Sequence, residues 1–138
     1  MSSSVSATGA GSYLLDSSIL ILSLRGDSAI RVRLGNATTL YIPSIALGEL
    51  FFGAYGSPTR AQAAIQDVAS LGVTMTILGI DAVTADIYGR IKHELRVKGY
   101  TMPDNDLWIG ATAIQYGLTL AARDVHFDWI DGLTVEQW

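Results

Sequence analysis

The sequence has no cysteine, few positive charges and no long hydrophobic run. Without cysteine, disulfides and thiolate metal sites are excluded, which fits a reducing compartment, and we expect the cytoplasm. Nine Lys and Arg residues against 13 Asp and Glu residues give a formal net charge of −4, which argues against broad electrostatic binding of nucleic acid. Every apolar stretch is interrupted well before the roughly 20 residues of a membrane span, so no membrane association is expected.

Length and composition predict a single folded domain. The 138 residues are 49% hydrophobic, which is enough to build a sizeable core. Residues 1–12 are rich in Ser, Gly and Ala and lack the basic start and apolar middle of a signal peptide. We therefore expect residues 1–12 to be a flexible tail and residues 13–138 to be the domain.

Segments typical of strands and of helices alternate along this domain. Apolar and β-branched runs predict five strands, at residues 13–16, 40–42, 73–78, 118–121 and 133–135. Helices are predicted between them, and Gly72, Gly99 and Gly117 are expected to end three of these helices. The alternation predicts an α/β fold with a mainly parallel sheet of four or five strands.

Four carboxylates lie at the edges of apolar segments: Asp16, Glu49, Asp106 and Asp124. Asp16 is the first charged residue of the chain, and Glu49 is the only charged residue of the segment SIALGELFFGAY. A buried ionised carboxylate costs several kcal/mol unless a partner compensates it, and the basic residues are too few and too distant in sequence to do so at each place. A divalent cation shared by all four acids would provide that compensation.

The predicted topology places these acids together. Asp16 and Asp124 follow predicted strands, and Glu49 and Asp106 lie near the amino ends of predicted helices. In open α/β sheets, ligands bind beyond the carboxyl ends of the strands, so the four side chains can reach one crevice. Oxygen ligands suit one or two Mg²⁺ or Mn²⁺ ions, and a pair of such ions is suited to phosphodiester hydrolysis.

Taken singly, each acid has a simpler explanation. Asp16 could be only a helix cap, and Asp124 could be an ordinary loop residue. Asp104 and Asp106 share the first turn of one helix, where acids are favoured, so their roles could be exchanged. The metal-site hypothesis therefore depends on all four acids together.

Charged and aromatic residues suggest further contacts. The candidate contacts to RNA phosphates are Arg25, Arg90, Lys92, Arg96 and Lys98, of which the last four cluster on one helix and could equally form a solvated face. His126 could touch a substrate, although we do not expect it to be catalytic. The aromatic residues Phe51, Phe52 and Tyr55 are more typical of a core or a dimer interface.

Four segments together resemble a known family. They are LLDSSILI, IPSIALGELFFGA, PDNDLWIGATAIQYGLTLAARDVHF and GLTVEQW, and with them residues 13–138 resemble PIN-domain ribonucleases, specifically VapC-type toxins of toxin–antitoxin pairs. The resemblance implies a three-layer α/β/α fold and Mg²⁺-dependent endonucleolytic cleavage of RNA, often tRNA or rRNA. It also implies a small VapB-like antitoxin as partner, and homodimers.

The resemblance also assigns roles to residues. It implies that Asp16, Glu49, Asp106 and Asp124 are the catalytic, metal-binding acids and that Ser18 is the hydroxyl two residues after the first acid. Ala122 stands where many relatives carry Thr or Ser. Together with the low positive charge, this departure motivates an alternative function, a non-catalytic PIN scaffold that binds RNA or a protein partner.

Overall fold

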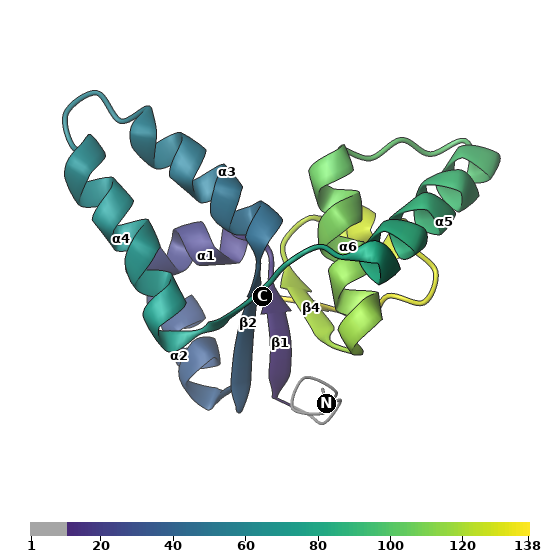
Figure 1. Cartoon of the computed structure of the whole chain (residues 1–138). Helices are drawn as coiled ribbons and strands as arrows, with labels where there is room; N and C mark the ends of the chain where they lie inside the picture. Colours follow the sequence, from purple (N-terminus) through teal and green to yellow (C-terminus); the bar gives the residue numbers. More distant parts are fainter. Residues whose placement is uncertain (1–10) are drawn as a thin grey trace.

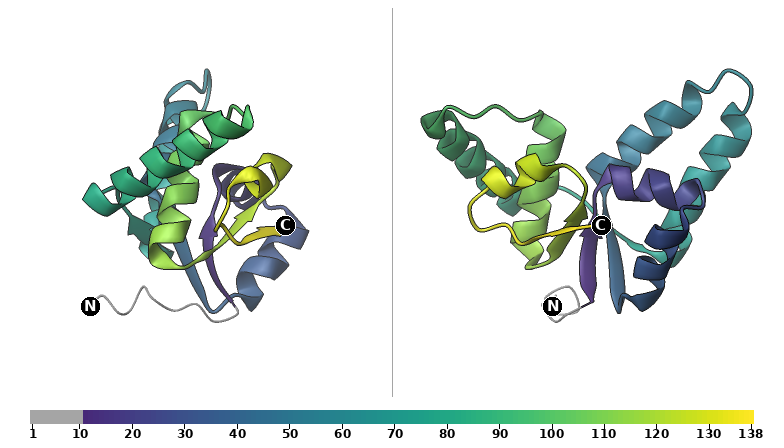
Figure 2. Two further views of the ribbon diagram at one scale, coloured as in Figure 1. Left: turned by 90° about the vertical axis from the view of Figure 1, so that its right-hand side faces the viewer. Right: turned by 180° about the vertical axis from the view of Figure 1, so that it is seen from behind.

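The structure, a computed structural model, describes residues 11–138 and consists of a parallel sheet between two layers of helices (Figures 1 and 2). Most of the expected tail, residues 1–10, lies outside the described residues, and Ser12 is already the first residue of a strand. The predicted α/β fold with a parallel sheet is confirmed, and the sheet has five strands in the order β3-β2-β1-β4-β5.

The bounds of the elements are as follows. The strands are β1 (Ser12–Leu15), β2 (Thr39–Pro43), β3 (Thr76–Leu78), β4 (Thr119–Ala122) and β5 (Val135–Gln137). The helices are α1 (Ser17–Leu24), α2 (Ser28–Asn36), α3 (Ser44–Tyr55), α4 (Ala61–Thr74), α5 (Ala82–Lys98) and α6 (Asp104–Tyr116), with a 3₁₀ helix η2 (Val125–Trp129) between β4 and β5.

The helices form two arms that diverge beyond one edge of the sheet. Figure 1 and the right panel of Figure 2 show α1–α4 on one side of the strands and α5 and α6 on the other. Helix α3 packs along α4, and α5 packs along α6. Because α3 starts directly after β2, this arm rises from the carboxyl ends of the strands, where ligands bind in open α/β sheets.

The central strands and helix α6 form the middle of the core. Leu14 and Leu15 of β1 and Leu120 of β4 are fully buried. Helix α6 has six buried residues, so it is buried on most of its sides. At Gly110 of α6, an added Cβ would lie 2.9 Å from Ile130 Cδ1, so glycine allows the segment after η2 to approach α6 closely.

Gly99 and Gly117 end their helices as predicted. Gly99 follows α5 with φ 81°, and Gly117 follows α6 with φ 65°, so both adopt the left-handed conformation that glycine accepts without strain. Helix α5 begins at a capping box, in which the Asp81 side chain accepts hydrogen bonds from the backbone N–H groups of Val83 and Thr84.

The prediction for Gly72 is wrong. Helix α4 continues through Gly72 to Thr74, and strand β3 starts only at Thr76. A Cβ at position 72 would lie 3.0 Å from Ile77 Cδ1, so this glycine lets α4 pack closely against β3 instead of ending the helix. A glycine that is small for packing cannot be told from a helix terminator by sequence alone.

One further boundary differs from prediction. Helix α4 begins at Ala61, after a separate turn in which the Ser57 hydroxyl accepts a hydrogen bond from the Arg60 backbone N–H. The edge strand β5 is Val135–Gln137, two residues later than predicted, and pairs in parallel with β4.

Within residues 11–138, no helix is long and apolar enough to cross a membrane.

Candidate functional site

Asp16 lies between β1 and α1 and is only 6% exposed. Its backbone N–H donates to the Ala121 carbonyl of β4 at 3.0 Å, which fixes it at the carboxyl ends of two neighbouring strands. The Ser18 hydroxyl donates to Asp16 Oδ2 at 3.0 Å, while Oδ1 is buried and has no hydrogen-bond partner. The side chain makes no capping hydrogen bond to α1, although the backbone N–H groups of Ser17 and Ser18 are near enough to lower its pKa.

Glu49 projects from α3 and is half-buried. Its Oε1 is buried and accepts no hydrogen bond. Asp16 Oδ1 and Glu49 Oε1 are the only buried side-chain oxygen or nitrogen atoms without a partner in residues 11–138. Such an atom costs free energy because it has lost its water without gaining a donor, so two of them on acids of one site need an explanation.

Asp106 lies in the first turn of α6 and is half-buried. Burial is the largest cause that raises its pKa, and together with the negative charges of Asp16, Glu49 and Asp124 it brings the pKa to about 6. Burial is also the main cause that raises the pKa of Asp16, with a smaller contribution from Asp124. Because charges influence one another strongly only at short range, these effects show that the four acids share one environment.

Asp124 follows β4 and precedes the 3₁₀ helix η2. Its Oδ1 accepts a hydrogen bond from the His126 backbone N–H at 2.9 Å and lies 2.9 Å from His126 Nδ1. When protonated, His126 also lowers the pKa of Asp106. His126 therefore lies at the edge of the acidic site. From the sequence, it was expected only as a possible contact to substrate.

The four acids are electrostatically coupled but do not already form a finished set of metal ligands. Among residues 11–138, no three His, Asp or Glu side chains are arranged to hold an ion in this conformation. Carboxylates that repel one another favour side-chain conformations that keep their charges apart.

Comparison with known proteins decides the family. The family model for the PIN domain matches residues 13–133. The chain belongs to the PIN-domain family. Ribonuclease VapC2 of Haemophilus influenzae is 34% identical over 91% of this chain and 97% of its own length.

Solved structures agree with this assignment. A DNA-bound VapBC complex from Salmonella typhimurium contains a chain with a TM-score of 0.85 and 27% identity, covering 92% of this chain and 98% of that chain. VapBC2 from Rickettsia felis, bound to a DNA fragment from its promoter, gives a TM-score of 0.84 and 26% identity over 91% of this chain and 98% of that chain. The three-layer PIN fold expected from the sequence is thereby confirmed.

In this PIN domain, Asp104 and Asp106 have different surroundings although they share one helical turn. Asp104 is exposed and accepts hydrogen bonds from the Tyr88 hydroxyl at 2.8 Å and from Lys92 Nζ at 2.9 Å. The Lys92 ammonium lowers the pKa of Asp104, whereas the pKa of Asp106 is raised. Asp104 thus links α6 to α5, and Asp106 is the acid whose pKa the other three acids raise.

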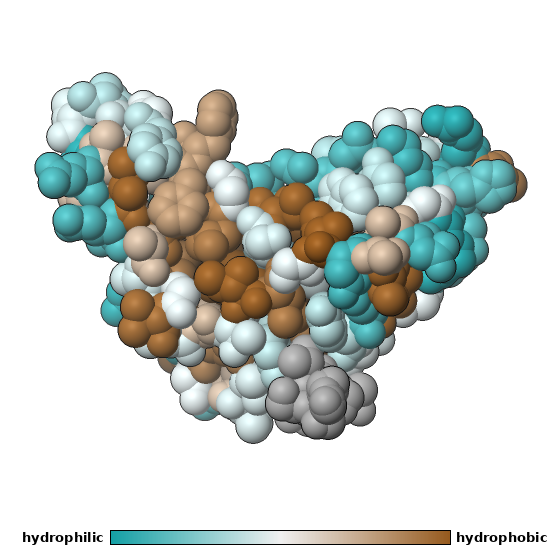
Figure 3. All heavy atoms as spheres, viewed as in Figure 1, coloured by the Kyte–Doolittle hydropathy of each residue, from teal (hydrophilic) through white to brown (hydrophobic). Residues whose placement is uncertain are grey.

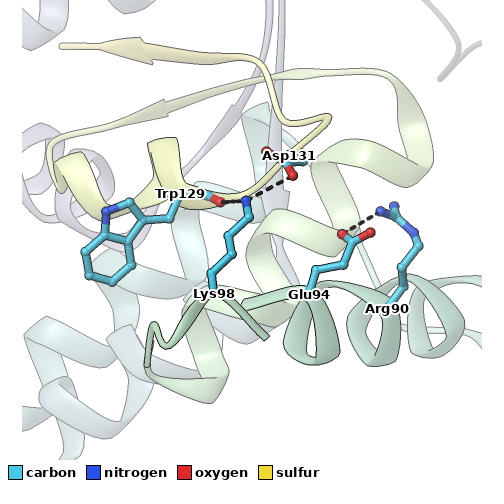
Figure 4. A network of polar contacts seen from close by, with 5 residues as sticks. All are labelled: Arg90, Glu94, Lys98, Trp129 and Asp131. Atoms are coloured by element: carbon cyan, nitrogen blue, oxygen red, sulfur yellow. Dashed lines mark hydrogen bonds and ion pairs between the residues drawn. The ribbon is translucent and has the colours of Figure 1, made fainter. Parts of the chain in front are cut away.

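The candidate RNA contacts also divide into two groups. Arg90 pairs with Glu94 at 3.1 Å, Lys92 with Asp104 at 2.9 Å, and Lys98 with Asp131 at 2.9 Å (Figure 4 shows the first and last of these). Arg25 and Arg96 have no ion pair within the described part of the chain. Only these two of the five cations are free to compensate a ligand's charge without first losing a partner.

The raised pKa of Asp106 predicts a pH-dependent cost in the metal-free protein. The Asp106 carboxyl binds its proton more tightly in the folded state, with a pKa of about 6 against an ordinary value of 3.8. The folded protein therefore loses stability as the pH rises through that interval. Asp106 is half-exposed, so solvent screening limits the effect to about 1 kcal/mol. We expect Asp106→Asn to stabilise the metal-free protein by about this amount at pH 7.

This prediction is checked by urea unfolding in EDTA at several pH values. The difference in free energy of unfolding between Asp106→Asn and the unsubstituted protein should shrink toward zero as the pH falls below the ordinary pKa of an aspartate. Both side chains are then neutral. A destabilised Asp106→Asn protein at pH 7 would contradict the charge repulsion inferred for the site.

Proposed function

We propose that this chain is a metal-dependent endoribonuclease that acts as the toxin of a toxin–antitoxin pair in the cytoplasm, with tRNA or rRNA as substrate. The observation that carries the proposal is the coupling of four acids from separate elements, two of which hold buried oxygens without a hydrogen-bond partner. The names of the similar proteins, ribonucleases called VapC, support the same reaction.

The proposed cofactor is one or two Mg²⁺ or Mn²⁺ ions held by Asp16, Glu49, Asp106 and Asp124. An all-oxygen set of this kind suits these hard cations, and a cation would satisfy the unpaired Asp16 Oδ1 and Glu49 Oε1. When bound, it would supply a nucleophilic hydroxide at neutral pH and stabilise negative charge on the phosphate that is cleaved.

The protein's own groups prepare the acids for this role. The Ser18 hydroxyl orients Asp16 by its hydrogen bond to Oδ2 and leaves Oδ1 available. The His126 backbone N–H and ring hold Asp124 through Oδ1 and leave Oδ2 available. Because Asp106 holds its proton up to a pH of about 6, metal binding must displace that proton at lower pH, so cleavage should increase as the pH rises toward neutral.

The direct test is a calorimetric titration with Mn²⁺. We expect the unsubstituted protein to bind the ion and Asp106→Asn to weaken binding at least about tenfold, because a ligand is lost. Asp104→Asn is the matched control, since it removes the same charge from the same helical turn, and its affinity should stay within about twofold. Binding should also raise the free energy of unfolding, by about 2.7 kcal/mol at 100 times the dissociation constant.

The alternative, a non-catalytic scaffold, has one observation in its favour. Ala122 is fully buried at the end of β4 and offers no hydroxyl beside Asp124. The same titration separates the two functions. Absence of Mn²⁺ binding by the unsubstituted protein would favour the scaffold and reject the nuclease.

A protein partner is part of the proposal. A groove of about 330 Å³ between α1, α3 and α4 has an apolar floor and a charged rim that includes Arg25, Glu49 and Arg60. Because Glu49 belongs both to this groove and to the acidic site, a VapB-like antitoxin segment lying in the groove would reach the acids. A homodimer is proposed as well, since Phe52 and Tyr55 of α3 are 83% and 69% exposed, and Figure 3 shows hydrophobic surface along the inner side of this arm.

A further inference from the structure

Three aromatic rings form a continuous row that leads away from the acidic site. His126 Nδ1 lies 2.9 Å from Asp124 Oδ1, and the His126 ring lies 4.5 Å from the Trp129 ring, between centroids, at a tilt of 48°. The Trp129 ring in turn stacks on Tyr100 with centroids 4.4 Å apart and planes 21° apart. We call His126, Trp129 and Tyr100 the aromatic row.

The row is held in place by the elements on either side. Lys98, at the end of α5, donates to the Trp129 backbone carbonyl at 3.4 Å and to Asp131 Oδ2 at 2.9 Å, so it ties both ends of the turn after η2 to α5 (Figure 4). Phe127, between the two η2 members of the row, is fully buried. The rings are therefore positioned before any ligand arrives, which lowers the entropic cost of binding.

The row is nevertheless open to solvent. Tyr100 is 42% exposed and the His126 side chain is 53% exposed. A stack that serves packing alone gains by burying its rings, whereas these rings bury part of their surface in one another and leave the rest exposed. An exposed, prepositioned aromatic surface is suited to stacking on a planar ligand.

A free cation lies beside the outer end of the row. Tyr100 and Arg96 line one cavity of about 220 Å³, formed by the end of α5, the following loop and Leu107 of α6. Arg96 has no ion pair in the described residues, and the acids on the neighbouring elements Asp104 and Asp131 are neutralised by Lys92 and Lys98. Asp128 of η2 is exposed and has no ion pair in the described residues, so its charge opposes an anion, and any attraction here depends on Arg96.

We propose that an unpaired segment of the RNA substrate lies along the aromatic row, with one base stacked on Tyr100 and a phosphate of the same strand at Arg96. A ring beside a guanidinium is the combination that binds single-stranded nucleic acid, since bases stack on aromatic side chains and phosphates pair with cations. A base inside a duplex has no free face, so the segment that occupies the row must be unpaired. The direction of the row carries the strand from Tyr100 past His126 to the acids.

That the strand continues to the acids for cleavage rests on the proposed function, whereas binding of RNA along the aromatic row does not. The test therefore measures binding without cleavage, by fluorescence anisotropy of a labelled single-stranded RNA of about ten nucleotides, with Asp106→Asn protein in EDTA. We expect Tyr100→Leu to weaken binding about 5- to 100-fold, the equivalent of one lost base stack. Tyr100→Phe keeps the ring and should restore affinity to within about twofold.

The phosphate contact has a separate signature. Arg96→Gln should weaken binding and reduce the slope of log affinity against log salt by about 0.7, the value for one contact to a single strand. Arg90→Gln is the matched control, because it removes the same charge from the same helix at a residue paired with Glu94, and its slope should not change. A duplex of the same sequence should bind at least about fivefold more weakly than the single strand.

The outcomes separate this proposal from the proposed function. Equal affinity of Tyr100→Leu, Tyr100→Phe and the parent protein would overturn the row as an RNA site, even if Mn²⁺ binding and cleavage behave as expected. Equal loss in Tyr100→Leu and Tyr100→Phe would also overturn it, because base stacking requires only the ring. If Tyr100→Leu loses affinity and Tyr100→Phe keeps it, but the unsubstituted protein does not bind Mn²⁺, the results would support the row and reject the nuclease.

Discussion

Asp106→Asn is expected to lower Mg²⁺-dependent RNA cleavage at least about 100-fold while leaving the fold intact. The substitution removes the one acid whose pKa is raised by all three others, and with it one of the four negative charges proposed to bind the ion. Asp16→Asn should have an effect of the same size, because it replaces a buried, unpaired carboxylate oxygen at the junction of β1 and α1. Initial rates on an end-labelled RNA, with circular dichroism of each variant, measure both effects.

Asp104→Asn is the control for this experiment. It lies two residues from Asp106 on the same turn of α6, but its carboxylate is bound to Lys92 and Tyr88 of α5. We expect its cleavage rate to stay within about threefold of the unsubstituted protein, as for surface ion pairs of small effect. Equal losses in Asp104→Asn and Asp106→Asn would show that the two roles have been assigned wrongly, and undiminished cleavage in Asp16→Asn and Asp106→Asn would reject the acids as catalytic.

Phe127→Ala is expected to lower the free energy of unfolding by about 3–5 kcal/mol. Phe127 is the largest side chain among those that are fully buried in residues 11–138, and it anchors η2 between β4 and β5. Its removal leaves a cavity beneath the turn that carries His126 and Trp129. Equilibrium unfolding in urea measures the loss.

Val125→Ala is the comparison for this substitution. Val125 belongs to the same 3₁₀ turn but is 62% exposed, so its truncation should change stability by less than about 0.5 kcal/mol. A change of similar size in both variants would mean that the turn is not anchored through Phe127. A loss below about 1 kcal/mol in Phe127→Ala would mean that the pocket collapses around the smaller side chain.

Local sequence signals predicted the elements that position the site. Gly99 and Gly117 end α5 and α6 because each adopts a positive φ, a conformation that favours glycine wherever it occurs. The apolar run around Leu14 and Leu15 marked β1, and the acid that follows it therefore falls at the carboxyl end of the sheet. Periodicity and punctuation of this kind depend on few neighbours in sequence, so they can be read from the chain directly.

Features that depend on tertiary contacts could not be predicted in the same way. Position 72 needs a small residue because Ile77 packs against it, and the neighbouring residues in sequence do not indicate that contact. The difference between Asp104 and Asp106 comes from Lys92 and Tyr88 on another helix. The stacking of Tyr100 on Trp129 joins residues 29 positions apart, and no local pattern marked either as part of one surface.

The most direct test of this account is a crystal structure of the protein grown with Mn²⁺, with the ion located by its anomalous scattering. We predict density for manganese among Asp16, Glu49, Asp106 and Asp124, with Asp16 Oδ1 and Glu49 Oε1 turned toward it. Carboxylates that remain apart, with no anomalous density among them at millimolar Mn²⁺, would contradict the claim that these acids form a cation site.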